Sequence, residues 1–130
     1  MILNDIQKKY ILNKLSTLKK SKFRSSFHLR KYMIEYIDKV GLEKIEEHAR
    51  DFIIDRIACK NPKKDGKQTP MRGHPVFVAQ HACGCCCRSC LEKWHNIPKD
   101  RELKEKEINY LVCLIMYWIN LEYNKYIWFY

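Results

Sequence analysis

The sequence predicts an all-α single domain, with about five helices arranged around an irregular central segment rich in cysteine and histidine. Three observations support this fold class. Apolar residues recur at helical spacing on both sides of residues 59–101, and no segment alternates with the two-residue period of a strand. The length of 130 residues suits one domain, and an apolar content of 46% is enough for a hydrophobic core.

The first three helices are predicted by stripes of apolar residues. A basic N-terminal helix is expected within residues 1–20. A second helix ends at Gly41, since glycine suits a helix C-terminus, and a third helix continues to Ile57. His48 lies near the stripe of the third helix, one turn before Phe52. We therefore expect His48 to be a packed or hydrogen-bonded histidine rather than a metal ligand.

The central segment, residues 59–101, is predicted to combine a long loop with two short helices. Its first part has no period and is interrupted by proline and glycine, and a loop of this length in a small domain is usually functional or disordered. Pro75 can open a short helix at its first position, ending near His81. Further helical turns are expected from Cys86 to Trp94.

A C-terminal helix is predicted over residues 103–123, and its apolar run of nine residues is too short to span a bilayer. The tail from Tyr126 to Tyr130 is also apolar, and exposed apolar surface of this kind usually marks an interaction site. We expect the tail either to fold back onto the first helix, near Tyr10 and Leu15, or to pack in a homodimer.

The formal net charge of +10 is concentrated in two segments. Residues 1–31 hold nine Lys or Arg against one acid, and residues 59–75 hold five against one. Such local excess suggests an anionic partner, most simply nucleic acid, although a lysine-rich composition that serves solubility is the competing interpretation. The candidate nucleic-acid contacts are Lys19, Lys20, Lys22, Arg24, Lys67 and Arg72.

The cysteine content points to a reducing compartment. The first residues lack the apolar core and cleavage site of a secretory signal, so a cytoplasmic location is expected, and there cysteines stay reduced. Seven cysteines are an odd number, which also argues against a fully paired disulfide framework. A thiol cluster in such a compartment more often indicates metal or redox chemistry.

Five of the seven cysteines and three of the five histidines lie within residues 65–101. Thiolate and imidazole are the preferred ligands of zinc, and structural zinc sites take four of them in a tetrahedron. Cys87 and Cys90 are spaced so that two thiolates can reach one ion, and His95 follows as in a zinc knuckle, but Asp100 occupies the fourth position. His81, Cys86 or His74 can complete a set, and the sequence does not choose among them. Our preferred zinc ligands are His81, Cys87, Cys90 and His95, with Cys86 as a substitute ligand, and an iron–sulfur cluster is the second choice of cofactor.

Other residues of this segment have structural interpretations. Cys59 and Cys113 are expected to be small core residues, because cysteine is among the most buried residue types. Cys83 and Cys85 flank a glycine and are expected to be exposed in a turn, and Arg88 is expected to be solvated.

A small enzyme is an alternative function. His74 and His81 can act as general acid or base, and a cysteine becomes a nucleophile when a neighbour lowers its pKa. No ordered set of nucleophile, base and orienting group is visible, so no reaction is assigned. The catalytic candidates are His74, Arg72 and Gln68, and they should then converge on the cysteines within hydrogen-bond reach.

Two long runs of the central segment, Asp65 through Ala82 and Cys86 through Lys99, carry a resemblance that covers roughly residues 15–120. They resemble the hallmark runs of a bacterial family of short proteins known only as a domain of unknown function, number four-one-eight-six. The resemblance implies no established activity. Relatives usually read Thr-Ala-Thr where this chain has Cys83-Gly84-Cys85, which makes these two cysteines the weakest metal candidates. The residues that match the family pattern position by position are Cys86, Cys87, Cys90, His81 and His95.

The sequence thus favours a cytoplasmic, zinc-binding helical domain that contacts nucleic acid. The alternatives are a small enzyme with a His/Arg/Cys site in residues 65–95 and a metal-free helical interaction module.

Overall fold

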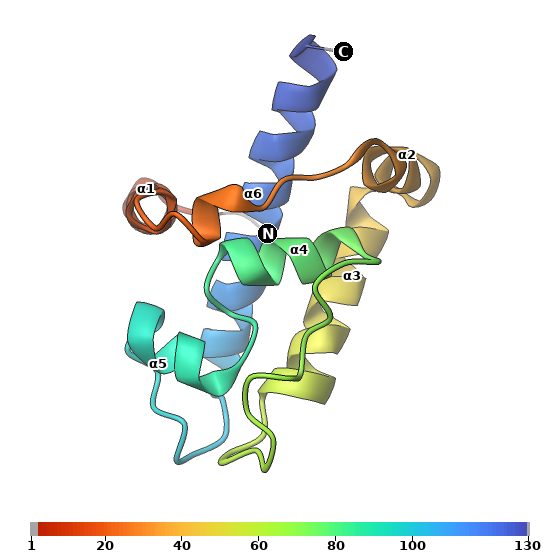
Figure 1. Ribbon diagram of the computed structural model, residues 1–130. Helices are drawn as coiled ribbons and strands as arrows, with labels where there is room; N and C mark the ends of the chain where they lie inside the picture. Colours follow the sequence, from red (N-terminus) through yellow and green to blue (C-terminus); the bar gives the residue numbers. More distant parts are fainter. Residues whose placement is uncertain (1–2, 130) are drawn as a thin grey trace.

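The computed structural model describes residues 3–129 and confirms the all-helical fold. Six α-helices and no strand occur within these residues (Figure 1). The α-helices are α1 (Asp5–Lys19), α2 (Lys31–Val40), α3 (Leu42–Phe52), α4 (Pro75–Ala82), α5 (Arg88–His95) and α6 (Glu105–Phe129). Two shorter helical turns join them, a 3-10 turn η1 (Arg24–Ser26) and a π-helical turn η2 (Ile53–Ile57).

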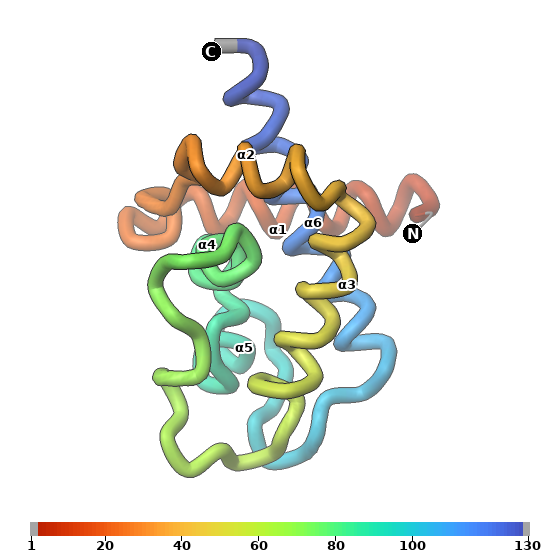
Figure 2. The backbone as a smooth tube through the Cα atoms, turned by 90° about the vertical axis from the view of Figure 1, so that its right-hand side faces the viewer, coloured from red at the N-terminus to blue at the C-terminus, as the bar shows by residue number. Residues whose placement is uncertain are grey.

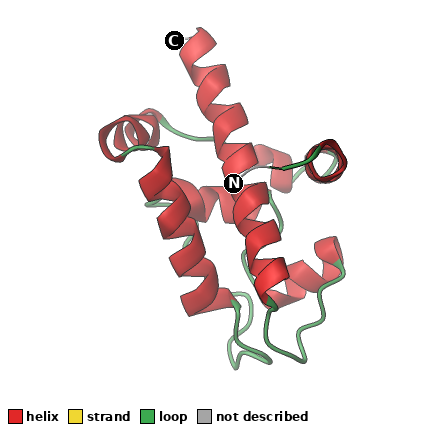
Figure 3. Cartoon of the chain, turned by 180° about the vertical axis from the view of Figure 1, so that it is seen from behind, coloured by secondary structure: helices red, strands yellow, loops and turns green. Residues whose placement is uncertain are grey.

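The long helix α6 is the element around which the others pack. It contacts α1, α3 and α4, and its buried face includes Leu111, Leu114 and Ile119. Figure 2 shows α1 and α2 lying across the bundle above α4, with α5 below α4. Seen from behind, α3 and the first half of α6 run side by side (Figure 3).

Local sequence signals account for the starts and ends of the first helices. Asn4 and Gln7 form a reciprocal capping box at the start of α1, with the Asn4 side chain accepting from the Gln7 N–H at 2.8 Å. Gly41 separates α2 from α3 at φ +87°, a conformation that L side chains rarely adopt. The predicted stop at Gly41 is therefore confirmed.

The third predicted helix does reach Ile57, but its last five residues form the π-helical turn η2. The Ala58 N–H donates to the Ile53 carbonyl at 2.9 Å, which is the five-residue spacing of a π-helix. This wider turn places both Ile53 and Ile57 in the core.

A fully buried arginine fixes the central segment. The Arg88 guanidinium donates to the carbonyl oxygens of Ala58 at 3.1 Å and Cys59 at 3.0 Å, and also to those of Pro98 at 2.6 Å and Arg101 at 3.0 Å. One cation thus ties the end of η2 to the segment that leads into α6. The expectation that Arg88 is solvated is wrong, because two loops turn their carbonyl oxygens inward and a guanidinium can satisfy several of them.

Three of the four structural expectations for cysteines also need correction. Cys59 is exposed, since it follows η2 where the chain enters the long loop, whereas Cys113 is buried as expected. Cys83 and Cys85 are buried rather than exposed, because their turn packs against α6, with Cys83 Sγ 3.9 Å from the Leu114 carbonyl oxygen.

Helix α6 continues to Phe129, beyond the predicted end at residue 123. Ile127 and Trp128 are 54% and 86% exposed, so the expected fold-back of these two residues onto the first helix is wrong. The Phe129 side chain and Tyr130 lie outside the described residues. The homodimer alternative stays a prediction. None of the helices in residues 3–129 has the length and hydropathy needed to cross a membrane.

Candidate metal centre

The cysteine-rich turn joins α4 to α5 and is held tightly between them. Gly84 turns the chain at φ +68°, and a Cβ at this position would lie 2.9 Å from Trp94 Cγ. Any larger residue at this position would therefore require the Trp94 side chain from α5 to shift. The thiol of Cys87 then caps α5, with its Sγ accepting from the Cys90 N–H at 3.4 Å.

Three cysteine sulfurs meet at this turn. The Sγ atoms of Cys86, Cys87 and Cys90 all lie within 4.8 Å of one another, and Cys86 Sγ is 3.6 Å from Cys90 Sγ. Two thiolates on one tetrahedral zinc ion are about 3.8 Å apart, given zinc–sulfur bonds of about 2.3 Å. Cys86 and Cys87 are buried, and Cys90 is half-buried. The cluster could therefore hold one metal ion without a large rearrangement.

Arg24 reaches the same cluster from η1. Its Nη2 donates to Cys90 Sγ at 3.1 Å, and its Nη1 donates to Cys86 Sγ at 3.5 Å and to the His81 carbonyl oxygen at 2.7 Å. Arg24 is only 8% exposed. The assignment of Arg24 as a nucleic-acid contact is therefore wrong, since its guanidinium faces sulfur inside the protein rather than solvent.

The surroundings of the three thiols favour a negative charge on Cys90. Hydrogen bonds from Cys86 and Cys87 lower the pKa of Cys90 against the effect of burial, and the hydrogen bond from Arg24 lowers it further. The hydrogen bond with Cys86 is the main cause that raises the pKa of Cys87. The hydrogen bond with Cys87 lowers the pKa of Cys86, but donation of a hydrogen bond to Cys90 and burial outweigh it and raise this pKa to about 11. These interactions thus favour the charged form at Cys90 over the charged forms of Cys86 and Cys87.

The two histidines of the predicted ligand set are engaged elsewhere. His95 has Nδ1 2.8 Å from the Tyr110 hydroxyl and Nε2 2.8 Å from the Cys83 carbonyl oxygen. His81 has Nε2 3.1 Å from the carbonyl oxygens of Thr69 and Pro70, and its ring stacks on Phe27. The structure therefore brings Cys87 and Cys90 together with the substitute ligand Cys86, and gives both histidines hydrogen-bonding roles instead.

Residues that sequence reasoning did not single out hold the long loop over the cluster. The Thr69 hydroxyl donates to the Cys86 carbonyl oxygen at 2.8 Å, and the buried Gln80 amide donates to Thr69 Oγ1 at 3.3 Å. Asp65 caps α5 by accepting from the N–H groups of Arg88 and Ser89. Burial raises the pKa of the Asp65 carboxyl, but hydrogen bonds outweigh it and lower this pKa to about 2. The hydrogen bond from Gln68 contributes most. In the sequence, Asp65, Thr69 and Gln80 stand out only because they lie in the long run that resembles the family.

Within residues 3–129, none of the catalytic candidates His74, Arg72 and Gln68 forms a hydrogen bond with a cysteine side chain. His74 caps α4 and lies 3.0 Å from His48 Nδ1 through its Nε2, and Gln68 is occupied by Asp65 at 2.6 Å. Arg72 is exposed and lines a surface cavity with Met33 and other residues, none of them cysteine. The small-enzyme alternative with His74, Arg72 and Gln68 therefore stays a prediction. The pairing of His48 agrees with its expected structural role.

The His48–His74 pair has a defined tautomer. His74 Nδ1 accepts from the Val76 N–H at 3.0 Å, so the proton of a neutral His74 is on Nε2 and points to His48. Burial, with a smaller contribution from the charge of His48, lowers the pKa of His74 to about 4. Burial likewise lowers the pKa of His95 to about 4.

The other predicted nucleic-acid contacts lie at the surface. Five of these side chains are exposed and form no ion pair in the described part of the chain. They are Lys19, Lys20, Lys22, Lys67 and Arg72.

Comparison with known protein families shows which family this chain belongs to. The family model described as a domain of unknown function, DUF4186, matches residues 12–120. The chain belongs to the DUF4186 family. The matched region contains the three-cysteine cluster and Arg24, so the candidate metal centre of this DUF4186 domain lies within the part that defines the family. No solved structure matches the chain.

Proposed function

We propose that this domain binds a single zinc ion through the thiolates of Cys86, Cys87 and Cys90. The observation that supports this proposal most is the position of three sulfurs within 4.8 Å of one another. The fourth position of the tetrahedron is left to a water molecule or another ligand from outside the chain. The proposal keeps two of the ligands that the sequence favours and replaces its two histidines by Cys86.

The charges around the cluster support the same proposal. Zinc carries two positive charges and Arg24 one, and together they balance three thiolates. Burial penalises a net charge, so a neutral arrangement is the stable one for a cluster whose sulfurs are largely buried. The hydrogen bonds from Arg24 to Cys86 and Cys90 would hold these two sulfurs in the orientation that binds the ion.

The close packing of the sulfurs favours one ion over an iron–sulfur cluster. A [4Fe–4S] cluster holds each cysteine on a different iron atom, and a [2Fe–2S] cluster holds at most two on one iron, so neither brings three cysteine sulfurs as close together as a single ion does. The proposal also assumes the reducing cytoplasm that the cysteine content predicts, since the free thiols must stay reduced to bind metal.

Elemental analysis of the untagged protein, prepared anaerobically without chelators, tests the proposal. We expect about one zinc per chain. Cys87→Ser and Cys90→Ser should lose the metal, whereas Cys59→Ser, at an exposed cysteine outside the cluster, should retain it. Absence of zinc from the wild-type protein, or equal loss in Cys59→Ser, would refute the proposal.

We also propose nucleic-acid contact as a second role. Five exposed basic side chains that form no ion pair within residues 3–129 support it, and Arg24 is no longer among them. Phosphate contacts release counterions, so binding should weaken steeply as salt rises.

Fluorescence anisotropy with labelled single- and double-stranded DNA and RNA tests this second role. Replacing Lys19, Lys20 and Lys22 together by Gln should weaken binding and reduce its dependence on salt, whereas Arg24→Gln should leave that dependence unchanged. Binding to none of these nucleic acids at low salt would rule the role out.

A further inference from the structure

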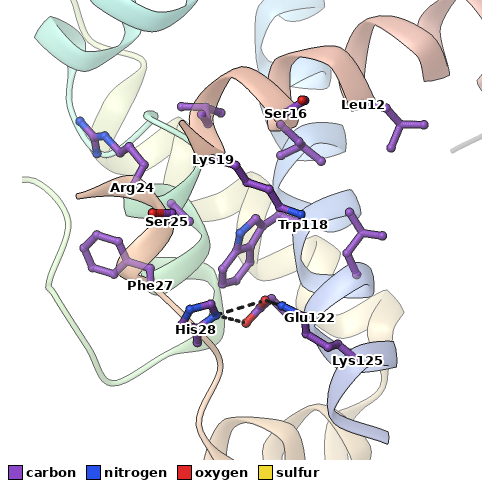
Figure 4. Close-up of a pocket in the computed structure, with 14 residues that line it drawn as sticks. Leu12, Ser16, Lys19, Arg24, Ser25, Phe27, His28, Trp118, Glu122 and Lys125 are labelled. Atoms are coloured by element: carbon purple, nitrogen blue, oxygen red, sulfur yellow. Dashed lines mark hydrogen bonds and ion pairs between the residues drawn. The ribbon is translucent and has the colours of Figure 1, made fainter. Parts of the chain in front are cut away.

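A groove with a volume of about 590 Å³ lies between the end of α1, the turn η1 and the second half of α6 (Figure 4). This volume falls in the range of small-molecule sites, which is about 300–1,000 Å³. Lys19 from α1 and Trp118 from α6 point into it from opposite walls. No cysteine lines the groove, although Arg24, which contacts the sulfur cluster, is one of its lining residues.

The walls of the groove are mainly apolar. Leu12 and Leu121, each 47% exposed, lie on α1 and α6, and Leu15 and Trp118 lie deeper along the same two helices. A ligand that fills the groove removes the two facing apolar walls from water, and this burial lowers the free energy. The groove therefore suits a ligand with an apolar body.

The lining of the groove contains more basic than acidic side chains. Glu122 is the sole acid among the lining residues, and its carboxylate accepts from the Leu29 N–H at 3.1 Å and pairs with His28 at 3.2 Å and Lys125 at 3.7 Å. Arg24 is committed to the sulfurs and to the His81 carbonyl oxygen. Lys19 has no ion pair within residues 3–129, so it remains as an uncompensated cation at the edge of an apolar groove.

We propose that this groove binds a small amphipathic carboxylate, with its carboxylate at Lys19 and its apolar body between Leu12 and Leu121. One uncommitted cation matches one negative charge, which favours a monocarboxylate over a polyphosphate. The groove offers few uncommitted hydrogen-bonding groups, which favours an alkyl or aryl body over a sugar. An apolar body of about ten carbon atoms suits a site of this size.

Decanoate is a suitable probe for the full-length chain labelled with nitrogen-15. Amide signals of the groove should shift saturably, with a dissociation constant on the order of 100 µM, as a ligand of this size allows. Decanol has the same body without the charge and should bind at least tenfold more weakly. Lys19→Glu should weaken decanoate binding at least tenfold, whereas Lys8→Glu, at an exposed position of α1 outside the groove, should not.

A second variant tests the location of the site. Ser16 is exposed and lines the groove, so Ser16→Phe should fill it and abolish the saturable shifts without disturbing the core. No saturable shift at millimolar decanoate, or an equal loss in Lys19→Glu and Lys8→Glu, would overturn the proposal. Groove signals that shift with protein concentration alone would also overturn it, because they would assign the groove to a second copy of the chain.

Discussion

Arg24 Nη2 lies 3.1 Å from Cys90 Sγ, so an arginine from the turn after the first helix directly contacts the most acidic thiol of the cysteine cluster. Hydrogen bonds to Cys86 and Cys90 raise the pKa of Arg24 although burial acts in the opposite direction. The contact explains why a guanidinium is buried at this place. It also links the N-terminal part of the fold to the candidate metal centre.

Arg24→Gln should weaken zinc binding by about 10–100-fold, the usual effect of losing a group that orients metal ligands. Glutamine removes the positive charge that balances the third thiolate but keeps a polar, planar side chain. Competition with a chromophoric chelator measures the affinity. Arg30→Gln, at an exposed position six residues later, is the matched control and should bind zinc as the wild type does. Equal affinities of the two variants would contradict the role given to Arg24.

Arg88→Leu should lower the free energy of unfolding by more than about 3 kcal/mol, because several buried carbonyl oxygens would lose their donor. Arg72 is exposed, so Arg72→Leu should change stability by only about 0.5 kcal/mol. Urea unfolding of metal-free protein, followed by circular dichroism, compares the two variants. If Arg88→Leu were as stable as Arg72→Leu, the carbonyl cluster would not depend on the arginine.

Acid should destabilise the fold through two histidines. The pKa values of His74 and His95 are both lowered to about 4 from an ordinary value of 6.5. The unfolded chain therefore binds more protons than the folded chain between these values, and stability falls as pH falls from 6.5 towards 4. We expect a total loss of about 2–4 kcal/mol over this window.

Urea unfolding of metal-free protein at several pH values measures this loss. His74→Asn keeps a residue that caps helices well but cannot titrate, so it should flatten the pH dependence. An unchanged slope in His74→Asn would show that His74 does not contribute.

The helical arrangement could be predicted because apolar stripes report directly on the faces that pack. The stop at Gly41 and the start at Pro75 followed from backbone preferences of single residues. The pair of Cys87 and Cys90 followed from helical spacing, which the N-terminal turn of α5 provides.

The inner polar network could not be predicted in the same way. Arg24 and Arg88 look like surface cations in a basic sequence, and their burial depends on sulfur and carbonyl groups that arrive from distant segments. The hydrogen bonds of His81 and His95 likewise depend on where the loop and Tyr110 lie in space. The extent of α6 was underestimated because its apolar tail has no residue that ends a helix.

The exposed end of α6 predicts self-association. Trp128 is 86% exposed and Ile127 54%, and apolar surface of this kind usually marks an interaction site. We expect a homodimer at micromolar concentrations that Trp128→Ala weakens, as measured by light scattering. Lys125→Ala, at an exposed polar position on the same helix, is the control. A chain that stays monomeric at high concentration would contradict this prediction.

X-ray absorption at the zinc edge tests the central proposal most directly, because it counts the ligand atoms by type. Coordination by Cys86, Cys87 and Cys90 predicts three sulfur atoms at about 2.3 Å and one lighter atom at about 2.0 Å. Two sulfur and two nitrogen atoms would instead indicate the set His81, Cys87, Cys90 and His95, and would require both histidines to leave their hydrogen bonds. That result, or a protein that retains no zinc, would contradict the three-cysteine site.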